Sequence, residues 1–262
     1  MEGVSLYDAR LRHAPRACRL PLCAHVLAVA LGALAPGIFA LAQSAHAATV
    51  AVDVGHYKSA PGATSARGRA EFDFNLDLAQ DIAAALPREG LAAKIIGADG
   101  MMEQLTARTR AAAGTDFFLA VHHDSVQERF IDEWQDEGMV RRYSDRYAGF
   151  SLFVSRKDPR LEQSLACASA MGAALIEAGF TRSLYHAEPI DGESKPFADR
   201  AHGVHYYDNL VVLKTASSPA VLFEAGVIVN RDEELRIAAP AVRAAIAAAV
   251  AKGLRACLQV VR

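Results

Sequence analysis

Apolar runs of four to seven residues alternate along the chain with longer stretches in which apolar residues recur at helical spacing. The clearest amphipathic stretch follows residue 70 and repeats at i, i+4, i+7, i+11 and i+14, in Phe72, Leu76, Ala79, Ala83 and Leu86. It predicts a helix over 72–86. Weaker patterns predict helices over 103–113 and 161–178, and from 232 and 240 to about 258. Continuous apolar runs predict strands at 49–54, 93–97, 116–122, 150–155, 210–213 and 220–224.

Strands that alternate with amphipathic helices form βαβ units. The sequence therefore predicts an α/β fold: a single three-layer α/β/α domain, with a mostly parallel sheet of about six strands and helices on both faces. In such sheets the reactive groups gather at the carboxyl ends of the strands. His56 follows the first predicted strand, His122 ends the third and Glu224 ends the last. We expect these three side chains to meet at one edge of the sheet.

The first 47 residues have the composition of an export signal. Four arginines lie within residues 10–19, an uncharged apolar stretch covers 20–42, and Ala45-His46-Ala47 matches the A-x-A pattern of a cleavage site. We predict a secretory signal peptide over 1–47, a mature domain over 48–262, and a periplasmic or secreted location. The alternative is an uncleaved membrane anchor, because the apolar stretch is long enough to span a bilayer. A cleaved signal would leave no stable anchor.

Charge and cysteine content narrow the class of protein further. Without residues 1–47 the chain has 24 basic and 28 acidic residues, a formal charge of −4. This mildly acidic balance gives no electrostatic basis for nucleic-acid binding. Cys167 and Cys257 remain, each in an alanine-rich helical stretch. They could pair in an oxidising compartment, and they could equally be buried thiols that pack as small hydrophobic residues.

The residues at the predicted sheet edge have the chemistry of a zinc hydrolase. Histidine nitrogens and carboxylate oxygens are common zinc ligands, and catalytic zinc sites keep one position open. His56, Glu71 and His122 supply two histidines and one glutamate, and Glu224 is placed to act as general base rather than as a ligand. Because side chains alternate along a strand, only one of His122 and His123 should face the metal, and we expect it to be His122.

Four short motifs occur in a fixed order along the chain. They are DVGH at 53–56, PGA at 61–63 with Gly68 and Glu71, LTAR at 105–108 before AVHHD at 120–124, and PAVLFEAG at 219–226 with Asn230 downstream. Together they resemble the zinc-dependent N-acetylmuramoyl-L-alanine amidases of bacterial cell-wall metabolism over essentially all of residues 49–258.

This resemblance implies one zinc ion (Zn2+) held by His56, Glu71 and His122, with Glu224 catalytic. It implies peptidoglycan or its muropeptides as the substrate. The reaction it implies is hydrolysis of the amide that joins the lactyl group of N-acetylmuramic acid to the L-alanine of the stem peptide.

Five positions beside these residues depart from the family pattern: Val54, Tyr57, His123, Asp124 and Val227. They leave the expected ligands in place and bear on the shape of the substrate pocket. Tyr57, His123 and Asp124 are candidate substrate-binding residues. His123 could instead form a hydrogen bond behind the ligands.

Two further segments carry polar residues that the family motifs do not include. Residues 124–148 form a charged insertion around Trp134, the only tryptophan. It fits a solvated surface helix or loop, and we favour a lid or substrate wall because it leaves the strand directly after His122. His186, His202 and His205 lie in a loop-rich region and are expected at the surface.

Three functions remain open on sequence grounds. The first is the murein amidase; the second is a zinc peptidase or amidase that acts on another wall peptide or an acylated amine. The third is a wall-binding domain without turnover, which the complete ligand set and Glu224 disfavour. A serine hydrolase is disfavoured further, because Ser125, Ser144 and Ser151 lie in no G-x-S-x-G motif.

Overall fold

The computed structural model describes residues 47–260, so the expected signal peptide lies outside the described residues except for Ala47. The helices and strands are, in chain order, β1 (Thr49–Val54), α1 (Glu71–Ala85), β2 (Ala92–Ile96), α2 (Leu105–Ala111), β3 (Phe117–Asp124), β4 (Asp132–Asp136), β5 (Met139–Tyr143), β6 (Ser151–Val154), α3 (Leu161–Glu177), β7 (Phe197–Asp199), β8 (Val204–Tyr206), α4 (Val211–Thr215), β9 (Ala220–Val227), α5 (Arg231–Ala238) and α6 (Pro240–Val260). Single 3₁₀ turns lie at Leu86–Glu89, Glu128–Phe130 and Tyr185–Ala187.

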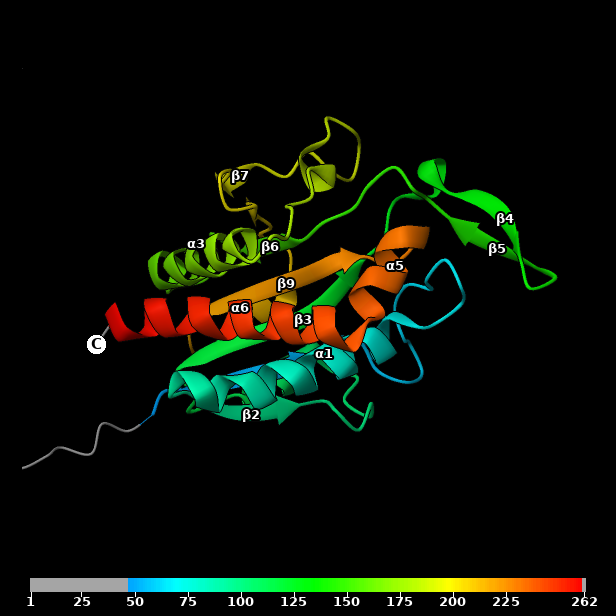
Figure 1. Cartoon of the computed structure of the whole chain (residues 1–262). Helices are drawn as coiled ribbons and strands as arrows, with labels where there is room; N and C mark the ends of the chain where they lie inside the picture. Colours follow the sequence, from blue (N-terminus) through cyan, green and yellow to red (C-terminus); the bar gives the residue numbers. More distant parts are fainter. Residues whose placement is uncertain (1–46, 261–262) are drawn as a thin grey trace, which may run out of the picture. The chain divides into compact units, whose positions relative to one another are not determined.

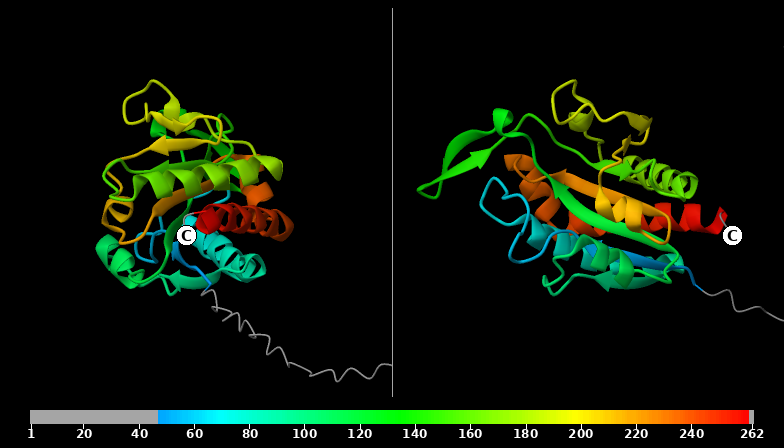
Figure 2. Two further views of the ribbon diagram at one scale, coloured as in Figure 1. Left: turned by 90° about the vertical axis from the view of Figure 1, so that its left-hand side faces the viewer. Right: turned by 180° about the vertical axis from the view of Figure 1, so that it is seen from behind.

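A seven-stranded sheet in the order β2-β1-β3-β9-β6-β8-β7 forms the centre of the domain. Strands β2, β1, β3 and β9 run parallel, whereas β6 is antiparallel to β9 and β7 is antiparallel to β8. Helices α1, α3 and α6 cover one face (Figure 1), and α2 and α4 pack on the other (Figure 2). The predicted α/β class with a mostly parallel sheet is confirmed, with seven strands in place of about six.

Alternation along β3 decides which side chains reach each face. Phe117, Leu119 and Val121 pack in the core under α1, α3 and α6, whereas Phe118 and Ala120 pack in the smaller core under α2 and α4. Both sets are fully buried, which is why the strand is continuously apolar in sequence. The same alternation carries on to the polar end of the strand.

The strand predicted at 210–213 is wrong. Residues Val211–Thr215 form α4, whose Val212 and Leu213 are buried in the second core. An apolar run of four residues is too short for its periodicity to separate a strand from one helical turn. The predicted face of α1 is correct at Phe72 and Ala79, but the buried stripe also includes Phe74, Leu78 and Ile82.

Residues 124–148 form neither a surface helix nor an irregular loop. Strands β4 and β5 pair antiparallel as a two-stranded hairpin that projects beyond the carboxyl ends of β3 and β9 (Figure 1). The half-buried positions Trp134, Arg141 and Tyr143 lie on one face of this hairpin. The strands were missed because most of their side chains are charged and exposed.

Cys167 and Cys257 form a disulfide that joins α3 to α6. The two cysteines are therefore paired, and they are not the separate buried thiols that the sequence also allowed. Within residues 47–260 no single helix is long and apolar enough to cross a bilayer. Only α5 and α6 taken together reach that length and composition, and they are bent by 76°.

Candidate metal centre

The first histidine of the site is held in an unusual backbone conformation at the end of β1. His56 has φ of 66°, a left-handed value that is uncommon outside glycine. The preceding Gly55 donates its N–H to Val121 O at 3.0 Å, and a Cβ at this glycine would lie 2.4 Å from the His122 ring. Glycine at position 55 therefore lets the ends of β1 and β3 approach closely enough to bring the two imidazoles together.

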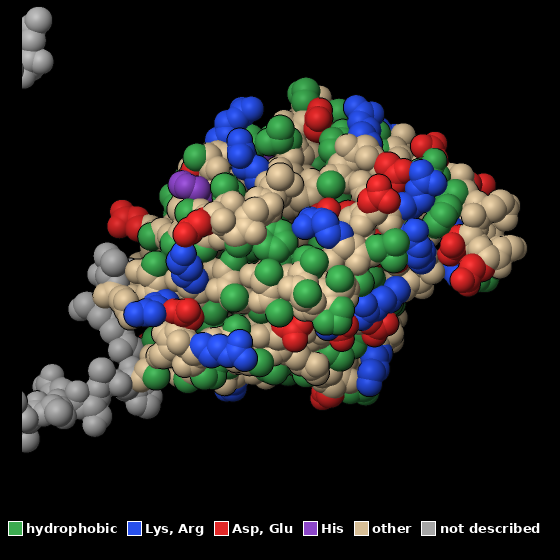
Figure 3. Space-filling model, in the orientation of Figure 1, with side chains coloured by type: hydrophobic (Ala, Val, Ile, Leu, Met, Phe, Trp, Pro, Cys, Tyr) green, Lys and Arg blue, Asp and Glu red, His purple; other side chains and the backbone are tan. Residues whose placement is uncertain are grey.

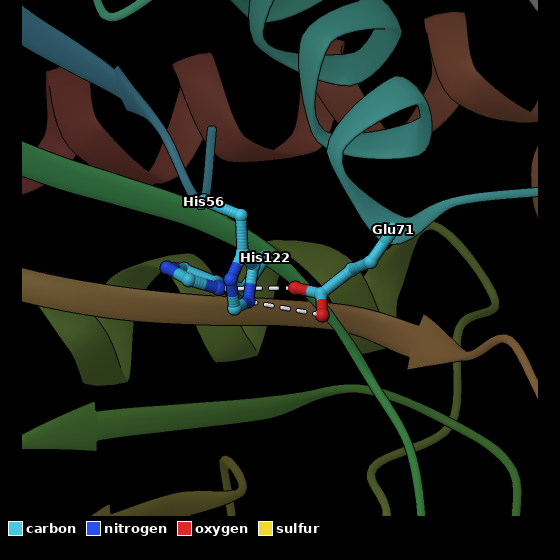
Figure 4. Close-up of side chains that lie close together, drawn as sticks. All are labelled: His56, Glu71 and His122. Atoms are coloured by element: carbon cyan, nitrogen blue, oxygen red, sulfur yellow. Dashed lines mark hydrogen bonds and ion pairs between the residues drawn. The ribbon is translucent and has the colours of Figure 1, made fainter. Parts of the chain in front are cut away.

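Three side chains from separate elements converge at the carboxyl edge of the sheet (Figure 4). Nε2 of His56 lies 3.0 Å from Oε2 of Glu71, and Nδ1 of His122 lies 3.1 Å from Oε1 of the same carboxylate. One donor atom of each residue lies within 4.8 Å of the other two. Glu71 is buried, whereas both imidazoles remain partly exposed. A ligand can therefore reach the group through the two imidazoles.

The Glu71 carboxylate is fixed by hydrogen bonds from its own helix and from the preceding loop. Nδ2 of Asn75, one turn along α1, donates to Oε1 at 3.1 Å, and the backbone N–H of Ala63 donates to Oε2 at 3.0 Å. Although burial opposes it, hydrogen bonds from His122 and His56 hold the pKa of Glu71 well below its usual range. The carboxylate is therefore ionised and aimed at the two imidazoles.

His123 lies on the opposite face of the sheet from His122. Its side chain is 2% exposed, its ring packs 5.4 Å from that of Phe74, and its Nδ1 lies 2.8 Å from Oδ1 of Asn75. Burial lowers the pKa of His123 to about 3, so the imidazole is neutral. His123 was expected either to bind substrate or to form a hydrogen bond behind the expected ligands. Its position fits the second role, because it contacts Asn75, which in turn donates to Glu71.

Glu224 lies directly beside His122 in the parallel ladder between β3 and β9. Its Oε2 is buried without a hydrogen-bond partner among the described residues. Burial, together with the nearby carboxylates of Asp124 and Glu71, raises the pKa of Glu224 well above its usual value. A buried carboxyl group with a raised pKa and an unpartnered oxygen is a candidate for proton transfer.

Asp124 belongs to a buried chain of charges that the sequence did not reveal. Its Oδ2 lies 2.7 Å from Nε2 of His186, whose Nδ1 lies 2.8 Å from Glu193, which in turn pairs with Lys195 at 3.0 Å. The expected surface position is wrong for His186 and also for His205, because both are buried. Their burial depends on partners in distant segments, which no local pattern indicates. His202 is partly exposed and pairs with Asp199.

Tyr57 and Arg108 flank the site on the side of β1. Tyr57 is partly exposed just beyond His56, and its backbone pairs with Ala60. Arg108, the last residue of the LTAR motif, is buried, and its Nη1 donates to Asp53 Oδ1 at 2.9 Å while its Nη2 donates to the carbonyl of His56. Burial raises the pKa of Asp53 to about 6, although Arg108 opposes this shift. Arg108 thereby fixes the backbone that carries His56.

Residues 50–256 match the family model described as N-acetylmuramoyl-L-alanine amidase. The chain belongs to this amidase family. The family is metal-dependent, which agrees with the two imidazoles and the carboxylate at the sheet edge. Membership also confirms the predicted enzyme activity, hydrolysis of the amide between N-acetylmuramic acid and L-alanine in peptidoglycan.

Solved amidase structures share the fold. An N-acetylmuramoyl-L-alanine amidase from Clostridium difficile 630 is 20% identical, with 82% of this chain and 98% of that one covered and a TM-score of 0.63. Ami1 from Mycobacterium smegmatis is 18% identical, covering 82% and 99%, with a TM-score of 0.64. The catalytic domain of CwlV from Bacillus (Paenibacillus) polymyxa var. colistinus is 23% identical, covering 81% and 99%, with a TM-score of 0.61. No curated protein sequence matches this amidase chain.

Proposed function

We propose that His56, Glu71 and His122 hold a single zinc ion and that Glu224 is the general base of the amidase reaction. The observation that supports this proposal most strongly is that two imidazoles and a carboxylate place their donor atoms within 4.8 Å of one another. The surroundings also fit an ion. A Cβ at Gly62 would lie 2.3 Å from Oε2 of Glu71 and 2.7 Å from the His56 ring, so only glycine leaves these donors uncovered.

The chain's own residues account for the proton transfers. When bound, zinc would polarise the scissile carbonyl and make water a stronger nucleophile at neutral pH. Glu224, which lies beside His122 with one carboxylate oxygen unpartnered, accepts a proton from the attacking water. It then donates that proton to the nitrogen of L-alanine as the C–N bond breaks, which releases the stem peptide and restores the carboxylate.

We further propose that the enzyme works outside the cytoplasm, in the periplasm or as a secreted protein. Residues 1–47 have the pattern of a signal peptide, and the Cys167–Cys257 disulfide is of a kind that persists in oxidising compartments. Peptidoglycan, its substrate, lies in the same compartment. Expression in a bacterial host followed by N-terminal sequencing of the exported protein should give Ala48 as the first residue.

Product analysis tests the substrate assignment. Purified enzyme is incubated with zinc and defined muropeptides, and the products are separated and weighed by mass spectrometry. We expect a free stem peptide with L-alanine at its amino end and an otherwise unmodified glycan. Cleavage within the peptide would reassign the enzyme as a wall peptidase. Intact muropeptides with bound protein would indicate a wall-binding domain.

A further inference from the structure

A cavity of about 410 Å³ adjoins the metal centre on the side of the β4–β5 hairpin. One wall is the loop between β1 and α1, including Ala63, whose N–H donates to Glu71. The opposite wall contains Ser125, which directly follows Asp124, and Arg141 of the hairpin. The cavity thus borders the Ala63 N–H that donates to Glu71, and Ser125 connects it to the polar end of β3.

Arg141 brings unsatisfied hydrogen-bond donors to this cavity. Its Nε is buried without a partner, and among residues 47–260 its guanidinium forms no hydrogen bond. Its ion pair with Asp136 is long, at 3.9 Å. A Cβ at Gly68 would lie 2.2 Å from Nη1 of Arg141, so the guanidinium lies against the opposite loop. The neighbouring Arg142 differs, because it is paired with Glu128.

The hairpin is fixed to the loop that carries the other wall. Trp134 lies opposite Arg141 in the β4–β5 ladder, and its Nε1 donates to Ala66 O at 3.1 Å. The guanidinium groups of Arg67 and Arg231 lie 5.2 and 5.1 Å from the centre of its ring. Figure 3 shows charged side chains gathered over this part of the molecule. Both cavity walls are therefore held in place before a ligand arrives, which reduces the ordering cost of binding.

We propose that this cavity is the stem-peptide subsite and that Arg141 binds a carboxylate of the stem peptide. The inference rests on the proposed function above. Charge distinguishes the two halves of the substrate: the lactyl carboxyl of N-acetylmuramic acid is consumed in the amide, whereas the stem peptide keeps free carboxylates. A guanidinium with open donors matches a carboxylate in a bidentate, charge-assisted pair. Arg141 is thus a specificity-determining residue rather than a catalytic one.

The test compares muramoyl tripeptides that differ only in which carboxylate is amidated. One has all its carboxylates free, one carries an amide at the second residue, and one carries an amide at the third. For the native enzyme, amidation at the recognised position should lower kcat/KM about tenfold, mainly through KM. In the Arg141→Gln variant the same amidation should have no effect on kcat/KM. The substitution and the amidation each remove the same ion pair, between the guanidinium and the carboxylate, so the second change has nothing left to remove. The position that responds identifies the carboxylate.

Control variants separate recognition from folding and from general charge. Arg129→Gln removes the same charge from an exposed position of the same segment outside the cavity and should retain the full amidation effect. Arg141→Lys should recover part of it. An amidation effect of equal size in native enzyme and Arg141→Gln, or no effect at either position in the native enzyme, would overturn the subsite.

A binding measurement tests the proposed subsite separately from the proposed amidase function. Equilibrium dialysis of the free stem tripeptide requires neither metal nor hydrolysis. Arg141-dependent binding without cleavage of muramoyl peptides would retain the subsite and refute the function. Cleavage that is indifferent to Arg141 would retain the function and refute the subsite.

Discussion

His122 and Glu224 are direct neighbours across the parallel strands β3 and β9, with side chains on the same face of the sheet. The pairing brings together two residues about one hundred positions apart in sequence, one with its imidazole aimed at Glu71 and one with an unpartnered carboxylate oxygen. In the proposed mechanism, this pairing places the general base beside a metal ligand without making it a ligand itself.

Replacing Glu224 by glutamine should separate these two roles. Glutamine keeps the size of the side chain but cannot accept a proton from water, so kcat should fall by about 10²- to 10⁴-fold. Zinc content should stay at the native level, because His56, Glu71 and His122 are unchanged. Glu162→Gln, at an exposed position on α3, is the matched control. A Glu224→Gln enzyme with native turnover would require another base.

Asn75 should act on metal affinity without touching the metal. Its fully buried amide joins Glu71, the carbonyl of Gly55 and His123. Asn75→Ala should reduce the free energy of unfolding by about 1–3 kcal/mol, because buried partners lose their hydrogen bonds. Zinc affinity should fall about 10- to 100-fold through loss of the support for Glu71. Chemical denaturation and competition with a zinc chelator measure the two effects, and unchanged affinity would contradict the role.

Stability should fall at alkaline pH because of His186. Burial opposes its charged form, but the carboxylates of Asp124 and Glu193 raise its pKa from 6.5 to about 9. A histidine with a raised pKa stabilises the fold fully below pH 6.5 and loses that contribution as pH rises through about 9. The difference in unfolding free energy between native protein and His186→Gln should therefore shrink between these values. A difference that grows with pH would exclude the charged pair.

Reduction of the disulfide should weaken the fold and spare the chemistry. Cys167 and Cys257 are 90 residues apart and join α3 to α6 in the core that these helices share with α1, and neither cysteine belongs to the metal centre. The double substitution Cys167→Ser, Cys257→Ser should lower the free energy of unfolding by about 2–5 kcal/mol. Activity per folded molecule at low temperature should stay near native. Equal melting temperatures with and without the bond would contradict this expectation.

Local pattern was sufficient for the α/β class, the parallel centre of the sheet and most of its helices. Strands such as the one predicted at 116–122 are buried on both faces, so a continuous run of apolar residues is enough to predict them. It was not sufficient for α4, which is too short to show a period, or for β4 and β5, whose side chains are mostly exposed.

Some residues of the site could likewise be predicted from the sequence, and some of its contacts could not. His56 follows a predicted strand, and His122 and Glu224 each end one, so the rule that strand ends meet at one edge was enough to group them. The links from Asp124 to His186 and from Ala66 to Trp134 of the hairpin join segments with no shared local signal. Asn75 was within reach of sequence reasoning, since it lies four residues after Glu71 on the same helix face.

Metal stoichiometry tests the central claim most directly. Native protein and the single variants His56→Ala, Glu71→Ala and His122→Ala are freed of metal, exposed to zinc, dialysed and measured by inductively coupled plasma mass spectrometry, with His202→Ala as control. We expect one zinc per native chain, the same in the control, and little or none in each of the three variants that retain the native circular dichroism spectrum. Full zinc occupancy in two or more folded variants would mean that these residues do not form the metal site.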